Sequence, residues 1–390
     1  MIALKGGKVV TVTGSTFENG VVLVEDGKIC AVGSADTIAI PQDAELVDVT
    51  GKWVTPGLID AHTHISTFAE PSPRPNIGDG NEITDPITAQ LRAIDSINPH
   101  DLAIAKAREA GFTTCYTGPG SANVIGGTGI SFKCKNGDSL FDIVIPGSAQ
   151  MKMALGENPK NCYGGNSKKM PQTRMAVAAL LRETLYNARV YSDKLKAAES
   201  DPSKAPTPNF KLDALVPVVR GEMKVRIHCH RADDITTAIR IAEEYHLDYS
   251  IEHATEGYKI LKVLKEHNCT CVVGPLLMDP VKMEIWGCRQ DTPAKMEEAG
   301  INFCLTQDTS SGTRWLPINV GICMARGLSE QAAFEAVTIR PAKLLGLSDR
   351  IGSLEVGKDA DIAIFDGHPF SNFTLCKATM IDGVFEYNAL

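Results

Sequence analysis

The chain has 390 residues, a hydrophobic content of 43% and a formal net charge of −8. A chain of this length exceeds one minimal domain and holds enough apolar residues for a sizeable core. The acidic balance, and the lack of a Lys/Arg cluster interleaved with aromatic residues, exclude a basic face, so we expect neither nucleic acid nor an anionic membrane as a partner.

The two ends of the chain carry the same pattern of short strands. Residues 1–55 alternate Val and Ile with polar residues and contain glycine turns such as the one at Asp26 and Gly27, a pattern typical of hairpin strands. Residues from about 350 onward return to alternating strands. We therefore predict a small β-sandwich domain that is discontinuous in sequence and is formed by residues 1–55 and 349–390.

The central residues 56–348 show a different pattern, in which apolar strands alternate with helices. Residues 99–110, 232–245 and 256–267 have helical patterns, and each is followed by a short apolar segment typical of a strand. Strands that alternate with helices indicate a parallel sheet. The predicted fold class is therefore α/β, with eight such units closing into a (β/α)8 TIM-like barrel whose functional groups lie at the carboxyl ends of the strands.

The first strand of this barrel ends in a pair of histidines. The segment 55–64, TPGLIDAHTH, places His62 and His64 one residue apart after an apolar run. Side chains at positions i and i+2 of a strand lie on the same face, so both imidazoles point together if the segment is extended. Two neutral imidazole nitrogens on one face suit zinc, iron or nickel. The pair therefore predicts half of a metal site.

Three later apolar segments end in residues of the same chemistry. His228 and His230 end one segment, His253 ends the next, and Asp308 closes a third just before a Ser/Gly-rich loop. A single histidine of this kind is more often a core residue, and a single aspartate more often caps a helix. Because all of these residues share one position in their local pattern, we interpret them as partners of His62 and His64 in one metal site.

These residues resemble those of the amidohydrolase superfamily of metal-dependent hydrolases, which carries an HTH motif after Pro-Gly-Leu-Ile-Asp, strand-end histidines such as His228 and His253, and an aspartate such as Asp308. The segment 351–366, IGSLEVGKDADIAIFD, resembles the return of that superfamily to its small β-domain. The resemblance spans nearly the whole chain and is greatest toward imidazolonepropionase-like and enamidase-like hydrolases. It implies one or two Zn²⁺ or Fe²⁺ ions per chain and a homo-oligomer that pairs through exposed helices.

A binuclear site in this superfamily needs an anion between its two ions, and the fourth strand offers two candidates. Lys152 lies within the strand and becomes anionic when it is carboxylated, whereas Glu157 follows a glycine at the strand end and needs no modification. We favour Glu157 for that reason. The resemblance thus implies a set of metal ligands with Lys152 as the alternative bridge: His62, His64, Glu157, His228, His253 and Asp308.

The ligand set implies hydrolysis of a C–N bond by metal-activated water, with Asp308 as general base and then general acid. We predict a small-molecule amide as substrate, in particular a cyclic amide, and His230 as a second catalytic residue that contacts the substrate, joins the metal or holds a carboxylate. The alternatives are a dipeptidase with carboxylated Lys152 and a ring deaminase, although a deaminase is expected to carry a glutamate shortly after His228. A non-catalytic barrel is expected to have lost ligands that this chain keeps.

Other segments bear on specificity. The glycine-rich residues 118–129 predict a loop that either brings backbone amides to a ligand or covers the barrel mouth. A basic side chain on a loop can hold a substrate carboxylate through paired hydrogen bonds. The candidate specificity residues on such loops are Arg74, Arg92, Tyr163, Arg289 and Arg314.

Two features bear on the compartment. No apolar run reaches the roughly 18 residues of a spanning helix, and the N-terminal residues lack the apolar region of a signal peptide. The 11 cysteines are scattered without CxxC spacing, which disfavours a disulfide framework and a cysteine-rich zinc site. We therefore expect a cytoplasmic protein whose cysteines are mostly buried thiols.

Overall fold

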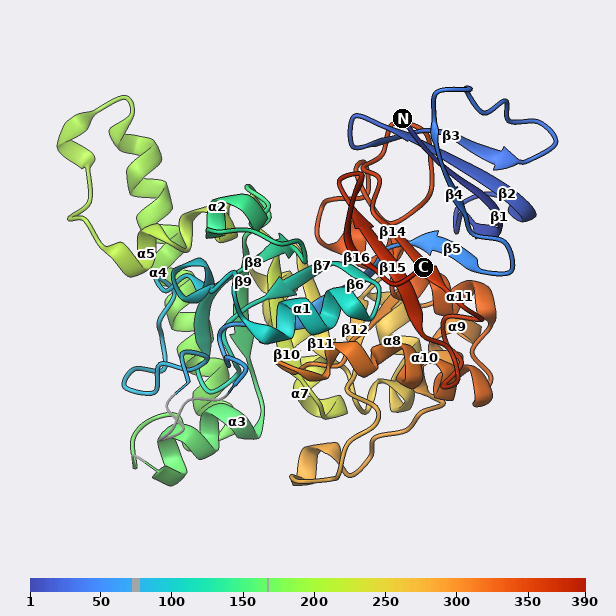
Figure 1. Ribbon diagram of the computed structural model, residues 1–390. Helices are drawn as coiled ribbons and strands as arrows, with labels where there is room; N and C mark the ends of the chain where they lie inside the picture. The colour runs from blue at the N-terminus through green and yellow to red at the C-terminus, as the bar shows by residue number, and fades with distance from the viewer. Residues whose placement is uncertain (72–77, 167) are drawn as a thin grey trace.

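A computed structural model describes residues 1–71, 78–166 and 168–390. The chain forms a barrel and a smaller sheet that lies beside it, at the upper right of Figure 1. Both termini belong to the smaller sheet, as predicted. Within the described part of the chain, no helix combines the length and the apolar character that crossing a membrane requires.

The small sheet combines strands from both ends of the chain. Its order is β16-β15-β14-β5-β1-β2-β3, with β4 also paired to β1. Residues with positive φ at Asp26 and Gly27, and again at Asp382 and Gly383, form the two-residue turns of its hairpins. The strands are β1 (Ile2–Val10), β2 (Thr16–Glu25), β3 (Lys28–Ser34), β4 (Glu45–Asp48), β5 (Trp53–Pro56), β14 (Ile362–Phe365), β15 (Cys376–Ile381) and β16 (Val384–Asn388).

The core of this sheet explains why the two termini must meet. Leu4 and Val22 come from the N-terminal strands and pack in one apolar cluster with Ile364 and Met380 from the C-terminal strands. Neither half of the chain covers this apolar face alone. All eight strands are joined into one hydrogen-bonded sheet, in which the first part of β1 pairs with β4 and its second part with β5.

The barrel follows as a second eight-stranded sheet whose strands lie in chain order, from β6 to β13. The Thr306 hydroxyl, just after β13, donates to the backbone carbonyl of His62 at 2.6 Å, so the last strand lies beside the first. This arrangement confirms the predicted α/β barrel. The strands are β6 (Leu58–Thr63), β7 (Phe112–Thr117), β8 (Ile125–Lys133), β9 (Gln150–Ala154), β10 (Val225–Cys229), β11 (Tyr249–His253), β12 (Thr270–Val273) and β13 (Phe303–Leu305).

One barrel strand differs from the parallel arrangement that we predicted. Strand β8 runs antiparallel to both of its neighbours, β7 and β9. Residues 118–124 connect β7 to β8, which is too short for the crossover of a dozen or more residues that a parallel pair needs. Part of the predicted glycine-rich loop is therefore strand. A side chain at Gly129 would meet the Tyr116 hydroxyl oxygen at 2.3 Å, so glycine is required there.

Helices cover the outside of the barrel. The predicted helical segments appear as α1 (Leu102–Glu109), as α7 (Ala232–Glu244), and as η4 (Gly257–Lys259) followed by α8 (Leu261–Glu266). The other α-helices are α2 (Leu140–Ile143), α3 (Glu157–Lys160), α4 (Arg174–Ala198), α5 (Phe210–Asp213), α6 (Val216–Val219), α9 (Thr292–Glu298), α10 (Leu316–Ala325), α11 (Glu330–Ala336) and α12 (Ile339–Leu344). Short turns of other helix types are η1 (Ala93–Ser96), η2 (Asn161–Asn166), η3 (Pro202–Lys204), η5 (Met283–Ile285) and η6 (Gly312–Trp315).

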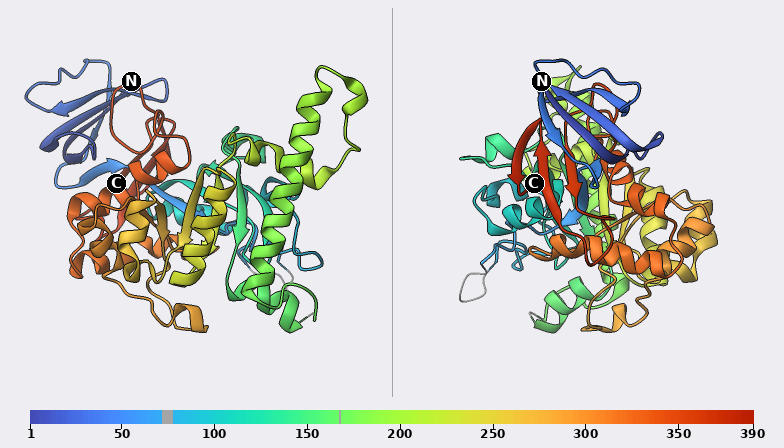
Figure 2. Two further views of the ribbon diagram at one scale, coloured as in Figure 1. Left: turned by 180° about the vertical axis from the view of Figure 1, so that it is seen from behind. Right: turned by 45° about the vertical axis from the view of Figure 1, so that its right-hand side comes forward.

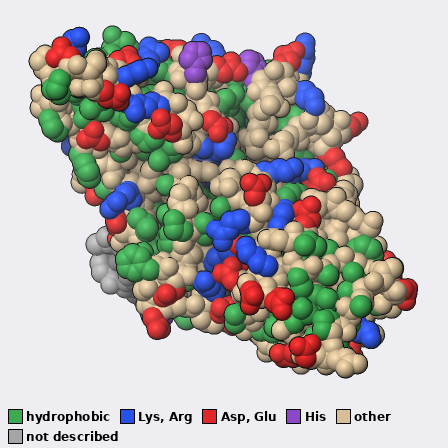
Figure 3. Space-filling view, turned by 90° about the horizontal axis from the view of Figure 1, so that it is seen from above, with side chains coloured by type: hydrophobic (Ala, Val, Ile, Leu, Met, Phe, Trp, Pro, Cys, Tyr) green, Lys and Arg blue, Asp and Glu red, His purple; other side chains and the backbone are tan. Residues whose placement is uncertain are grey.

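The helices also give the molecule its outline. Part of α4, together with η3 and α5, projects away from the barrel on the side opposite the small sheet (Figures 1 and 2). Helix α3 and the loop after β12 lie at the lower edge of Figure 1, which is the side of the barrel where the parallel strands end. On the face seen from above in Figure 3, acidic and basic side chains are interspersed.

A buried charge cluster joins the barrel to the small sheet. The ammonium group of Lys133, at the end of β8, lies 3.0 Å from Asp359, 2.7 Å from Asp361 and 3.0 Å from Asp382. Burial lowers the pKa of Lys133, but these three carboxylates outweigh burial and raise the pKa to about 12. Lys133 therefore stays charged. It neutralises Asp359 and Asp361, which directly precede β14, and Asp382, which begins the β15–β16 turn.

We expect Lys133→Met to destabilise the protein by about 3–5 kcal/mol, because it leaves buried carboxylates without their cation. Chemical denaturation measures this loss of unfolding free energy. Lys135→Met is the matched control, since Lys135 contacts Asp382 alone from a more exposed position and should cost less than about 1 kcal/mol. Equal stability of the two variants would contradict a role for Lys133 in joining the domains.

Candidate metal centre

The two histidines at the end of β6 converge on one carboxylate. The Nε2 atom of His62 lies 3.2 Å from Asp308 Oδ1, and Nε2 of His64 lies 3.3 Å from the same oxygen. The opposite nitrogen of each ring donates a hydrogen bond, from His62 Nδ1 to Glu252 at 2.5 Å and from His64 Nδ1 to the Gly118 carbonyl at 2.9 Å. These acceptors fix the proton on Nδ1, so both Nε2 atoms present a lone pair.

A second group of imidazoles lies beside the first. His228, His230 and His253 each offer a nitrogen, and these three atoms lie within 4.8 Å of one another. His253 also forms a second three-residue group with His62 and Asp308, whose ligand atoms again lie within 4.8 Å of one another. His253 therefore lies between the two sets of ligands. Its Nδ1 donates to the Gly274 carbonyl at 2.8 Å, and His230 Nδ1 pairs with the Thr255 hydroxyl at 2.8 Å.

The backbone is strained at two of these residues. His253 has a φ of +70° and Asp308 a φ of +52°, in the left-handed region that residues with a side chain rarely adopt. Such a conformation costs on the order of 1–3 kcal/mol and clusters at functional sites. In both places the left-handed turn comes where a strand or its extension ends, and it directs the side chain toward the shared centre.

Burial favours the neutral form of four imidazoles of the centre. It lowers the pKa of His64, His228 and His230, and it lowers the pKa of His253 to about 3. Burial also raises the pKa of the Asp308 carboxyl, but His253, His62 and His64 outweigh burial and hold that pKa well below its ordinary value. The centre therefore combines four imidazoles whose neutral form burial favours with a carboxylate that is held in its ionised form.

This donor set fits a divalent cation. Asp308 Oδ1 and His228 Nδ1 are buried and have no hydrogen-bond partner, and a buried polar atom without a partner is costly. Imidazole nitrogen and carboxylate oxygen are the ligands that zinc and iron accept. The residues that would hold such ions are therefore His62, His64, His228, His253 and Asp308, and His230 lies beside them.

The structure separates the two candidates for a bridging anion. Lys152 points into the barrel from β9, and its Nζ lies 3.1 Å from His62 Nε2. Glu157 begins α3, after Gly156 has carried the chain beyond the strand end, and it belongs to neither of the two ligand groups. This geometry favours Lys152 as the bridging residue and not Glu157, which we favoured from the sequence. The physical reason is that Lys152 lies within β9 and points into the barrel, whereas Glu157 lies beyond the strand end, at the start of α3.

Two residues that the sequence pattern did not single out hold His62 in place. Glu252 accepts from His62 and is paired with Arg226, whose Nη2 and Nε lie 2.7 and 2.8 Å from the two carboxylate oxygens. Burial raises the pKa of the Glu252 carboxyl, but Arg226 and His62 outweigh burial and hold the pKa well below its ordinary value. The available signal was a charged residue inside each apolar segment, one position before His253 and two before His228.

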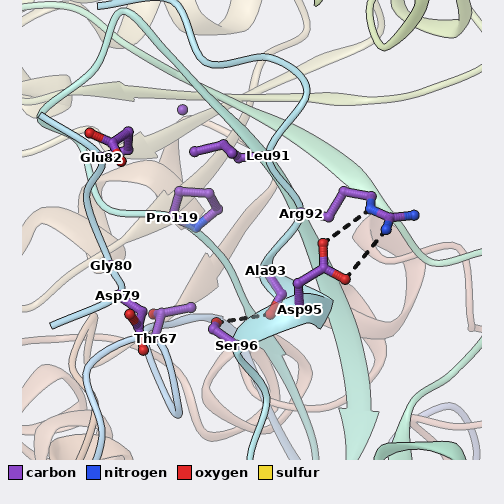
Figure 4. A pocket seen from close by; sticks show the side chains of 11 residues that line it. Thr67, Asp79, Gly80, Glu82, Leu91, Arg92, Ala93, Asp95, Ser96 and Pro119 are labelled. Atoms are coloured by element: carbon purple, nitrogen blue, oxygen red, sulfur yellow. Dashed lines mark hydrogen bonds and ion pairs between the residues drawn. The ribbon is translucent and has the colours of Figure 1, made fainter. Parts of the chain in front are cut away.

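The four candidate specificity residues that the structure describes make their polar contacts with groups other than the metal-ligand candidates. Arg92 pairs with Asp95 at 3.3 Å on the wall of a cavity of about 270 Å³, shown in Figure 4. Arg289 pairs with Asp291, and Arg314 lies 3.7 Å from Glu70. The remaining two are Tyr163, whose buried hydroxyl donates to the Asp85 carbonyl at 2.8 Å, and Arg74, which lies outside the described residues.

A barrel that gathers imidazole and carboxylate ligands at its strand ends is the arrangement of a metal-dependent hydrolase. A sequence profile of the Amidohydrolase family matches residues 53–387. The chain belongs to the amidohydrolase family.

Similar proteins agree with this assignment. The crystal structure of an amidohydrolase from Thermotoga maritima MSB8 superimposes with a TM-score of 0.93 at 38% identity, covering 100% of both chains. Amidohydrolase tasK of Hapsidospora irregularis is 27% identical over 95% of this chain, which spans only 40% of that protein. The imidazolonepropionase of Brevibacillus brevis is 25% identical over 90% of this chain and 85% of its own length.

Proposed function

We propose that the protein hydrolyses a C–N bond of a small amide at a centre of two divalent ions, zinc or iron. The observation that carries the proposal is the convergence of His62 and His64 Nε2 on Asp308 Oδ1 at 3.2 and 3.3 Å. Two imidazole nitrogens and an ionised carboxylate oxygen that converge in this way are the donor set that a divalent cation accepts. A divalent ion bound there supplies an activated water molecule and polarises the carbonyl group of the substrate.

The residues of the chain supply the proton transfers. Asp308 is ionised, so it accepts a proton from the attacking water at a carboxylate oxygen and then delivers it to the leaving nitrogen. His230 lies among His228 and His253 and orients the carbonyl group, with its own orientation fixed by Thr255. Glu252 and Arg226 hold His62 and do not move protons.

The substrate class we propose is a cyclic amide. This chain matches imidazolonepropionases over most of their length. The metal ligands do not by themselves distinguish ring amides from linear amides. A dipeptidase is the alternative that Lys152 supports, because a lysine beside His62 suits a carboxylated bridge. Hydrolysis of a panel of cyclic amides and dipeptides by zinc-loaded protein tests the proposal, and no turnover of any of them would contradict it.

Metal content separates the two bridging residues. We expect Lys152→Ala to lose about one metal equivalent per chain, because it removes the group beside His62 Nε2. Glu157→Ala should keep the wild-type content. Plasma mass spectrometry on protein purified without chelator measures both, and Glu157→Ala also serves as the control for a substitution near the mouth. Loss of metal from Glu157→Ala alone would restore Glu157 as the bridge.

A further inference from the structure

Lys282 lies in the loop between β12 and α9 and faces the opposite way from its neighbours. The apolar side chains of Val281 and Met283 are 77% and 65% exposed, whereas Lys282 between them is partly buried. Lysine ordinarily directs its ammonium group to water and leaves burial to apolar residues. This loop exposes its apolar side chains and turns its cation inward, so it does not serve to solvate the ammonium group.

The ammonium group of Lys282 lacks an acidic partner in the ranges that the structure describes. It donates to the side-chain oxygen of Asn158 at 2.9 Å, and no ion pair with a carboxylate is formed there. Glu284, the acid that follows in the loop, is engaged by Arg174 and by the backbone N–H of Glu157. Burial lowers the pKa of Lys282, and the negative charges of Glu284, Glu157 and Asp308 act in the opposite direction without pairing with it. An ammonium group has three donors, so two remain for a ligand.

The position of Lys282 relates it to the metal centre. Asn158, which accepts from Lys282, also places its amide nitrogen 3.3 Å from His228 Nε2. One amide group therefore separates the ammonium from a proposed metal ligand. The backbone N–H of Glu157 donates to Glu284 at 2.8 Å, so the loop after β9 and the loop after β12 are joined and the cation is held in place beside the barrel mouth.

We propose that Lys282 binds a carboxylate group of the substrate and so selects amides that carry a free acid. The inference rests on the proposed hydrolysis and names its substrate class more closely. The arginines that the sequence offered for this role, Arg92 and Arg289, are neutralised by their own aspartates. Lys282 instead donates to a neutral amide, and Glu284, Glu157 and Asp308 act on it only from beyond ion-pair distance. A charge-assisted bond to a substrate carboxylate would supply the direct partner that it lacks.

The test uses amides in matched pairs, each as the free acid and as the neutral carboxamide: dipeptides, N-acetyl amino acids and cyclic amides with a carboxymethyl group. Hydrolysis is measured with zinc-loaded wild type, Lys282→Met, Lys282→Arg and the surface control Lys262→Met. We expect wild type and the control to prefer the acids by tenfold or more in kcat/KM. The ratio should fall to near one in Lys282→Met and recover in part in Lys282→Arg.

A binding measurement gives a readout that does not depend on turnover. Calorimetric titration of the same acids into zinc-loaded Asp308→Asn should give a Kd about tenfold lower than titration into the Asp308→Asn, Lys282→Met double variant. Circular dichroism and metal analysis confirm that each variant is folded and loaded. Equal turnover of acids and carboxamides by wild type, or an acid preference that survives in Lys282→Met, overturns this inference and leaves the hydrolase intact. Absence of turnover and of binding for every pair overturns both.

Discussion

Replacing the aspartate at the centre, Asp308→Asn, is expected to lower kcat by about 10²–10⁴-fold, the range that one positioned acid–base group supplies. The amide oxygen of asparagine still coordinates a metal ion, but it does not accept the proton of water. Most of the bound metal should therefore remain. Steady-state hydrolysis together with metal analysis on the same preparation measures both quantities.

The structure provides a control for this substitution. Asp95→Asn removes a carboxylate from an exposed position where it pairs with Arg92, so activity and metal content should stay at wild-type levels. Full activity in Asp308→Asn would rule out the proton-transfer role. Loss of metal to the level of His62→Ala would instead assign Asp308 mainly to metal binding, because His62→Ala removes a ligand outright.

Glu252→Gln should have two separate effects. It leaves the buried guanidinium of Arg226 without its counter-charge, which we expect to cost about 3–5 kcal/mol of unfolding free energy. It also removes the carboxylate that fixes the proton on His62 Nδ1, and loss of such a partner typically weakens metal binding by about 10–100-fold. Chemical denaturation measures the first effect and competition with a chelator measures the second.

Folding and binding are kept apart by measuring metal affinity at a temperature where the variant is fully folded. Glu266→Gln is the matched control, because Glu266 forms a long, exposed pair with Lys262 at 3.6 Å and should change neither quantity. A Glu252→Gln protein with wild-type metal affinity would mean that His62 keeps its orientation without the carboxylate. Its stability would then report the Arg226 pair alone.

The sequence predicted the parts of this protein that depend on local pattern. Alternating strands at both ends and strand–helix alternation between them follow from periods of two and 3.6 residues, and the structure confirms both. The direction of β8 could not be predicted from this pattern, because an apolar strand has the same pattern whether it runs parallel or antiparallel to its neighbours. Only the length of its connection to β7 decides the direction.

The site divides in the same way. The ligand candidates His62, His228, His253 and Asp308 could be found because a strand end in a barrel is a fixed position in the sequence pattern. The sequence did not distinguish Lys152 from Glu157 as the bridging residue. The two lie only five positions apart, and the local pattern does not show where the strand ends between them.

What only the tertiary structure decided is which charges face one another. Arg226 and Glu252 lie 26 positions apart and meet inside the barrel, while Lys282 and Asn158 lie 124 positions apart and meet above it. The local pattern determines which face of a strand or helix is exposed. It does not determine which residues far away in the sequence a side chain contacts. The sequence alone thus determined the elements, the barrel and most of the ligand candidates, and the closure of the barrel determined their electrostatic partners.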